Sequence, residues 1–178
     1  MLTAIVVVLQ LLGTPLKLGM FAGAVALLPI VIGAALYGWK AGAWLGFAFG
    51  ATVLLSGDAA PFLAISIPGT IITVLAKGSV CGATSGLVHT LLARFNKALA
   101  AYTAAIVAPI VNTGIFAIGC YVFFYQDLIQ WNAGSAAPYA NTTGYIFLGL
   151  IGVNFFVELG TSVVLAPVIT RLIKIGQK

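Results

Sequence analysis

Few side chains in this sequence could do chemistry. A first group of polar residues lies in the last apolar stretch of the chain. Asn154, Glu158 and Ser162 follow one another at intervals of four residues, which places them on one face of a helix. An ionisable side chain at membrane depth is costly, so it normally faces a cavity, a polar partner or the interior of a bundle. We expect this face to line a ligand site. The alternative is a set of hydrogen bonds that only holds helices together.

Three further residues complete the predicted site. The ammonium group of Lys77 can meet a carboxylate, although neutralisation by Glu158 would weaken that argument. Asn112 stands one turn after Pro109, where a proline inside a helix frees a backbone carbonyl. Thr113 could instead satisfy that carbonyl. Asparagine amides pair with hydroxyl and amide groups, and a tryptophan near the membrane interface adds an aromatic surface. The predicted substrate-binding residues are Lys77, Asn112, Trp131, Asn154 and Glu158.

The remaining reactive groups do not predict an enzyme. His89 stands without a second titratable group one turn away, so a packing role is favoured over proton transfer. Cys81 and Cys120 fall within apolar runs and have no metal-ligand spacing, which is typical of packed small hydrophobic side chains. The sequence has no Gly-x-x-x-x-Gly-Lys-Ser/Thr phosphate-binding run. We expect no catalysis, no metal and no cofactor, and ATP hydrolysis would have to come from other subunits.

Composition predicts an integral membrane protein that consists of one domain, residues 1–178. The 178 residues are 62% hydrophobic and only 6% charged, whereas soluble domains carry about 25% charged residues. A membrane-spanning helix takes roughly 20 apolar residues, so the chain has room for about six spans and no soluble domain. The basic residues are scattered at helix ends and do not indicate nucleic acid binding. The predicted helices cover about 1–14, 20–37, 41–56, 69–94, 98–125 and 144–173.

Glycines repeat every four residues on the third predicted helix. Gly42, Gly46 and Gly50 share one face, and small residues let helix backbones approach closely in membranes. This face could pack inside the bundle or dock on another membrane subunit, and we take it as the candidate docking surface. The stretch 61–68 is too short to span and is bracketed by prolines, which predicts a re-entrant or interfacial loop.

The distribution of basic residues predicts the orientation. With six spans, the two termini and the loops near residues 40 and 95 lie on one side, and this side collects most of the lysines and arginines. The positive-inside rule therefore places both termini in the cytoplasm. The opposite side receives the longer connections near residues 13–19, 56–68 and 126–143. The polar residues of the predicted site then converge beneath these outer connections, as in a pocket that opens to the outside.

Several segments resemble the substrate-binding S components of energy-coupling factor (ECF) vitamin transporters. The resemblance spans about residues 20–170 and is carried by four runs. These are Ala34-Ala35-Leu36-Tyr37-Gly38-Trp39-Lys40-Ala41-Gly42-Ala43-Trp44-Leu45-Gly46, Lys77-Gly78 with Gly82 and Gly86, Ala108-Pro109-Ile110-Val111-Asn112-Thr113, and Val157-Glu158-Leu159-Gly160-Thr161-Ser162 with Ala166-Pro167. Within this family the chain most resembles the pantothenate-type members.

This resemblance implies a division of labour between subunits. An S component captures a vitamin from outside a bacterial plasma membrane with high affinity. It then associates with a membrane scaffold subunit and two cytoplasmic ATPases. Pantothenate is the favoured substrate, and riboflavin, a pyridoxine-like or a thiamine-related vitamin stay open as alternatives. The competing hypothesis is a secondary transporter driven by protons, with Glu158 and His89 as the relay.

Overall fold

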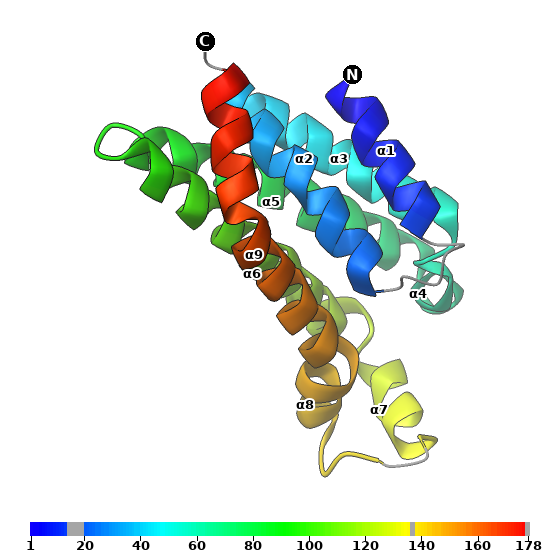
Figure 1. Cartoon of the computed structure of the whole chain (residues 1–178). Coiled ribbons are helices and arrows are strands. Elements are labelled where there is room, and N and C mark those ends of the chain that lie inside the picture. The colour runs from blue at the N-terminus through cyan, green and yellow to red at the C-terminus, as the bar shows by residue number, and fades with distance from the viewer. Residues whose placement is uncertain (14–19, 136–137, 177–178) are drawn as a thin grey trace.

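The fold is a bundle of helices that places six long segments side by side (Figure 1). The computed structural model describes residues 1–13, 20–135 and 138–176, and within these ranges the regular structure is helical. The predicted connection after Gly13, including Lys17, lies outside the described residues. The long helices are α1 (Leu2–Gly13), α2 (Met20–Tyr37), α3 (Trp39–Ser56), α5 (Ile67–Leu92), α6 (Lys97–Phe123) and α9 (Val153–Gly176).

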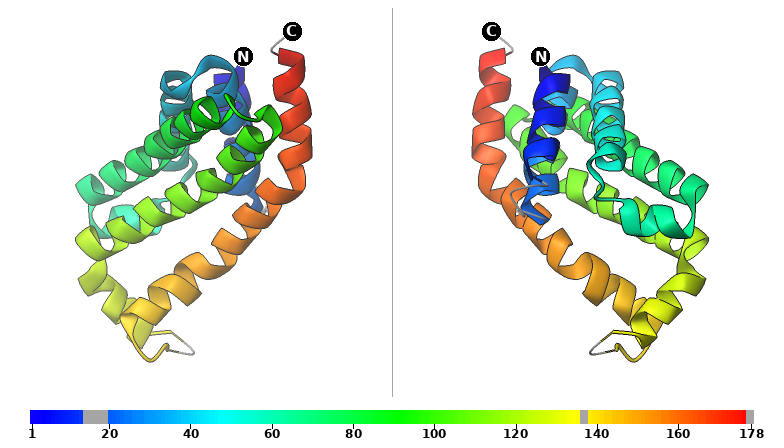
Figure 2. Two further views of the ribbon diagram at one scale, coloured as in Figure 1. Left: turned by 90° about the vertical axis from the view of Figure 1, so that its left-hand side faces the viewer. Right: turned by 90° about the vertical axis from the view of Figure 1, so that its right-hand side faces the viewer.

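Short helices fill the connections at one end of the bundle. These are α4 (Ala60–Ile65), α7 (Tyr125–Ala133) and α8 (Thr142–Gly144), and α8 continues into the π-helical segment η1 (Tyr145–Gly152) that leads into α9. Figure 2 shows both termini at one end of the molecule and the α7–α8 region at the other. The long helices therefore run from the end of the bundle that holds the termini to an end made of short helices and turns.

The predicted irregular loop at 61–68 is largely helical. Pro61 and Pro68 stand in the first turns of α4 and α5, where a missing N–H group costs nothing because those groups have no partner within the helix. Ser66 between them is extended, and its Oγ accepts a hydrogen bond from the N–H of Gly69 at 3.3 Å. The prediction was wrong here because each proline marks the start of a helix and not a break in one.

The predicted boundary of the fifth helix, 98–125, also needs correction. The stretch 98–125 ends as a helix at Phe123, because Phe124 leaves the helical conformation and α7 begins afresh at Tyr125. The predicted polar segment 126–143 therefore contains most of α7. At the other end, the side chain of Asn96 caps α6 by accepting from the N–H groups of Ala98 at 2.9 Å and Leu99 at 3.1 Å.

The glycine face of α3 packs against α5 within the same chain. Gly42 lies against the backbone of Gly82, and Gly46 lies against the backbone of Gly78. A Cβ atom at Gly50 would stand 2.7 Å from the carbonyl oxygen of Val74. Because α5 already covers these glycines, the face Gly42, Gly46 and Gly50 is not a docking surface for another subunit. The glycine face instead packs inside the bundle, which was the alternative prediction.

Long apolar helices and an apolar exterior fit a helical membrane protein. By length and composition, three described segments are able to cross a membrane: Ile67–Leu92, Lys97–Phe123 and Thr142–Ile173. Leu2–Leu12 and Val25–Tyr37 are shorter apolar helices. Large apolar side chains such as Leu55 and Phe156 are 85% and 70% exposed, which suits a bilayer better than water.

Candidate functional site

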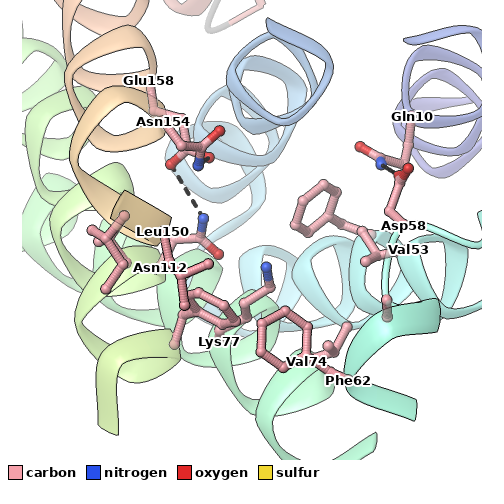
Figure 3. A pocket seen from close by; sticks show the side chains of 15 residues that line it. Gln10, Val53, Asp58, Phe62, Val74, Lys77, Asn112, Leu150, Asn154 and Glu158 are labelled. Carbon is pink, nitrogen blue, oxygen red and sulfur yellow. Dashed lines mark hydrogen bonds between the residues drawn. The ribbon is translucent and has the colours of Figure 1, made fainter. Parts of the chain in front are cut away.

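The candidate site is a cavity of about 340 Å³ that is lined in part by the connection between α3 and α4 (Figure 3). Its lining comes from seven elements and combines apolar walls with a small set of polar side chains. Such a combination is typical of small-molecule sites, which range from roughly 300 to 1,000 Å³. The polar lining residues are Gln10, Asp58, Lys77, Asn112, Thr113, Asn154 and Glu158. Four of the five predicted site residues are therefore brought together.

Glu158 is held by two asparagine amides. The Nδ2 atom of Asn112 on α6 donates to Oε2 at 3.2 Å, and the Nδ2 atom of Asn154 on α9 donates to Oε1 at 3.0 Å. Glu158 is only 3% exposed, and Ser162 on the same helix face is buried as well. The predicted polar face of α9 does point into the bundle. Each carboxylate oxygen has a donor, so the position of the carboxylate is set from two helices.

The carbonyl of Asn112 lacks a partner within the described residues. Asn112 is 4% exposed, and its Oδ1 atom forms no hydrogen bond there. The amide orientation follows from chemistry, since a carboxylate accepts from an N–H group and repels a carbonyl oxygen. Figure 3 shows the carbonyl oxygen turned away from Glu158. Asn112 thus presents a buried acceptor on the wall of the cavity.

Lys77 supplies the positive charge of the site. Its Nζ atom lies 5.2 Å from the centroid of the Phe116 ring, in a cation–π contact. Within the described part of the chain, no carboxylate oxygen lies within 4.0 Å of this ammonium group. Glu158 and Asp58 attract it from farther away. The ammonium group of Lys77 therefore faces the cavity without a direct ion pair to either acid.

Aromatic rings form one wall of the cavity, and Trp131 stands behind them. Phe62 packs edge-on against Phe116 with centroids 5.4 Å apart. The ring of Trp131 lies 5.6 Å from that of Phe62 on the side of α7. Phe62 and Phe116 line the cavity, but Trp131 is absent from its lining. Trp131 is therefore adjacent to the lining through Phe62 of α4, and its direct contact with a ligand stays a prediction.

The opposite rim joins α1 to the α3–α4 connection. The Nε2 atom of Gln10 donates to Oδ2 of Asp58 at 2.7 Å, and the hydroxyl of Ser56 donates to the same oxygen at 2.8 Å. Sequence reasoning missed Gln10 and Asp58 as lining residues. One signal was present, because Gln10 is the one amide side chain in the otherwise apolar α1.

The π-helical segment contributes a part of the site that the sequence did not indicate. Leu150 and Ile151 of η1 line the cavity just before Asn154. π-Helical turns are rare and frequently occur at functional sites.

Thr113 also lines the cavity, and no hydrogen bond of the described residues joins its hydroxyl to the carbonyl that Pro109 frees.

His89 is distant from this cavity. It lies in the last turn of α5, twelve residues beyond Lys77, which corresponds to about 18 Å along a helix. His89 is 3% exposed, and its Nε2 atom has no hydrogen-bond partner within the described residues. A direct relay between Glu158 and His89 therefore lacks the contact that it needs. No cluster of three metal-binding side chains occurs in the described ranges.

Comparison of the chain with protein-family models, with curated proteins and with solved structures gives no match. Fold and site fit a helical membrane protein with an amphipathic cavity, which holds a cation, a carboxylate bonded by two amides and a carbonyl that lacks a partner among the described residues.

Proposed function

We propose that this chain is the vitamin-binding membrane subunit, or S component, of an ATP-driven importer of the ECF type. In this proposal α1, α2, α3, α5, α6 and α9 are the six spans and both termini face the cytoplasm. The cavity lies at the outer side and captures the vitamin. A membrane scaffold subunit and two cytoplasmic ATPases then provide the driving force, because the described residues include no phosphate-binding loop.

One observation carries the proposal: the cavity brings Lys77, Asn112, Asn154 and Glu158 together from three helices of the bundle. Intramembrane polar groups are expensive and normally mark substrate pathways. The polar groups of this cavity are placed so that they can offer hydrogen bonds and a charge to a ligand. A direct proton relay to His89 has no support in the arrangement.

Pantothenate is the substrate that these contacts support best. Its carboxylate would face the ammonium group of Lys77, and its hydroxyl and amide groups would meet the asparagines. A cavity near the lower end of the usual size range suits a compact, flexible solute. Phe62 and Phe116 also allow a ring to stack, so riboflavin, a pyridoxine-like or a thiamine-related vitamin is the alternative.

Native mass spectrometry of the gently purified protein tests the proposal directly. The protein is measured as isolated and again after addition of a panel of vitamins, and proteins that co-purify with it are identified. An adduct of pantothenate mass together with co-purifying ATPases supports both role and substrate. A different vitamin keeps the role and changes the substrate.

The opposite result is equally clear. If no vitamin of the panel binds, and the protein alone in liposomes takes up a solute under a proton gradient, the S-component proposal is wrong. The chain is then a secondary transporter.

A further inference from the structure

The polar groups of the cavity have distinct hydrogen-bonding demands. Lys77 is a donor and a cation, so it requires an acceptor or an anion. Asn112 offers the opposite, because one N–H of its amide is bonded to Glu158 and its Oδ1 atom is buried without a partner among the described residues. Lys77 belongs to α5 and Asn112 to α6, and the cavity includes both.

From this arrangement we propose that the Oδ1 atom of Asn112 determines the chemical class of the ligand. The site takes an anionic solute that also carries a hydroxyl donor apart from its anionic group. The anion faces Lys77, and the donor bonds to Asn112. This inference rests on the proposed function and goes further, because it assigns the donor group of the ligand to one atom of the protein.

The Oδ1 atom of Asn112 is a buried acceptor that lacks a partner among the described residues. A buried polar group without a hydrogen bond costs roughly 1–3 kcal/mol, and native proteins rarely leave one. Asn112 cannot turn its carbonyl to a protein donor, since rotation of the amide would place Oδ1 against the carboxylate of Glu158 and would also break the bond at 3.2 Å. A ligand donor that approaches from the cavity satisfies the carbonyl once the side chains that cover Oδ1 move aside.

Asn154, the other asparagine bonded to Glu158, differs from Asn112 in the exposure of its side chain. Asn154 also donates to Glu158, at 3.0 Å, and also lines the cavity. Asn154 is only half-buried, so its carbonyl oxygen is not among the buried atoms that lack a partner. Asn154 therefore serves as a matched control, because its replacement removes one donor from Glu158 and leaves the buried acceptor in place.

Binding of pantothenate analogues to the unaltered full-length protein provides the first test, by isothermal titration calorimetry in detergent or nanodiscs. The analogues are the alcohol in which the carboxylate is reduced to a hydroxymethyl group, and two deoxy compounds that each lack one hydroxyl. A site built to bond a hydroxyl rejects the analogue without it. We expect one deoxy compound to bind about tenfold more weakly, or worse, than pantothenate.

The same titrations on Asn112→Leu and Asn154→Leu identify the atom responsible. In Asn112→Leu the preference for pantothenate over that deoxy compound falls to about threefold or less, because the acceptor is gone. In Asn154→Leu the preference persists. Asn112→Ala is the second variant if leucine does not fit, and thermal unfolding verifies that each variant is folded.

Each possible result of these titrations supports or overturns the assignment of the donor contact to Asn112. If pantothenate binds but every deoxy compound binds as well as it does, or if the preference survives in Asn112→Leu, the inference is overturned while the proposed function stands. A preference that is lost in Asn154→Leu instead assigns the donor contact to Asn154 and overturns it as well. If neither pantothenate nor another vitamin binds, the proposed function fails, and the inference fails with it.

Discussion

At the scale of single residues, Glu158 organises the hydrogen bonds of the site. Its carboxylate accepts hydrogen bonds from Asn112 on α6 and from Asn154 on α9, and so holds both side chains in place. In Glu158→Ala the Asn112 amide is free to rotate, so the buried acceptor loses its fixed direction. We expect the affinity for pantothenate to fall about tenfold or more, as measured by calorimetry.

Ser162→Ala is the matched control for this variant. Ser162 lies one turn further on the same face of α9 and is 2% exposed, but it does not line the cavity. Its replacement should leave the affinity unchanged. Equal affinity in Glu158→Ala and in the parent would show that the ligand binds elsewhere.

Lys77 tests the charge of the site independently. Lys77→Met retains a flexible apolar side chain against the ring of Phe116 and removes the ammonium group. We expect pantothenate to bind at least about tenfold more weakly, while the neutral alcohol analogue binds as it does to the parent. Lys40→Met is the control, since Lys40 lies beside Trp39 at the start of α3 and outside the cavity. An equal loss for both ligands would argue against a carboxylate contact.

At the scale of helices, the close approach of α3 and α5 builds the wall that carries Lys77. A methyl group at Gly46 would overlap the carbonyl group of Gly78. Overpacking of this kind costs typically about 1–3 kcal/mol. We expect Gly46→Ala to lower the free energy of unfolding by that amount in a detergent titration, and Gly46→Leu to lower it further.

A second glycine provides the control for this prediction. A Cβ atom at Gly114 on α6 would meet no heavy atom of the described chain within 4 Å. Gly114→Ala should therefore be neutral or stabilise the protein by up to about 1 kcal/mol, because alanine favours a helix. Equal unfolding free energies for Gly46→Ala and Gly114→Ala would remove the argument for close backbone packing.

At the scale of the whole molecule, the orientation in the membrane decides which side supplies the ligand. Phe95 lies in the turn between α5 and α6 and is 85% exposed, and Ala133 is exposed at the end of α7. In a background without Cys81 and Cys120, we expect a membrane-impermeant maleimide to label Ala133→Cys in intact cells. Phe95→Cys should react only after permeabilisation, because basic loops stay in the cytoplasm. The reverse pattern would place the cavity on the cytoplasmic side.

The sequence was sufficient for local features whose cause is local. Apolar composition and segment length predicted a helical protein suited to a membrane, and most helix boundaries lie within a few residues of the prediction. The spacing of Asn154, Glu158 and Ser162 predicted a buried face on α9, since the helix period alone determines which side chains share a face. The glycine repeat likewise predicted a close helix approach.

The tertiary structure decided how these faces are paired, because pairing depends on contacts between residues far apart in the chain. Gly42 and Gly46 could have met any helix, and their partners Gly82 and Gly78 are known only from the folded bundle. Phe62 of α4 lines the cavity and packs against Trp131, which does not line it, and this arrangement is known only from the folded bundle. Above all, the side-chain carbonyl of Asn112 lacks a partner among the described residues because Glu158, on another helix, engages the other half of its amide.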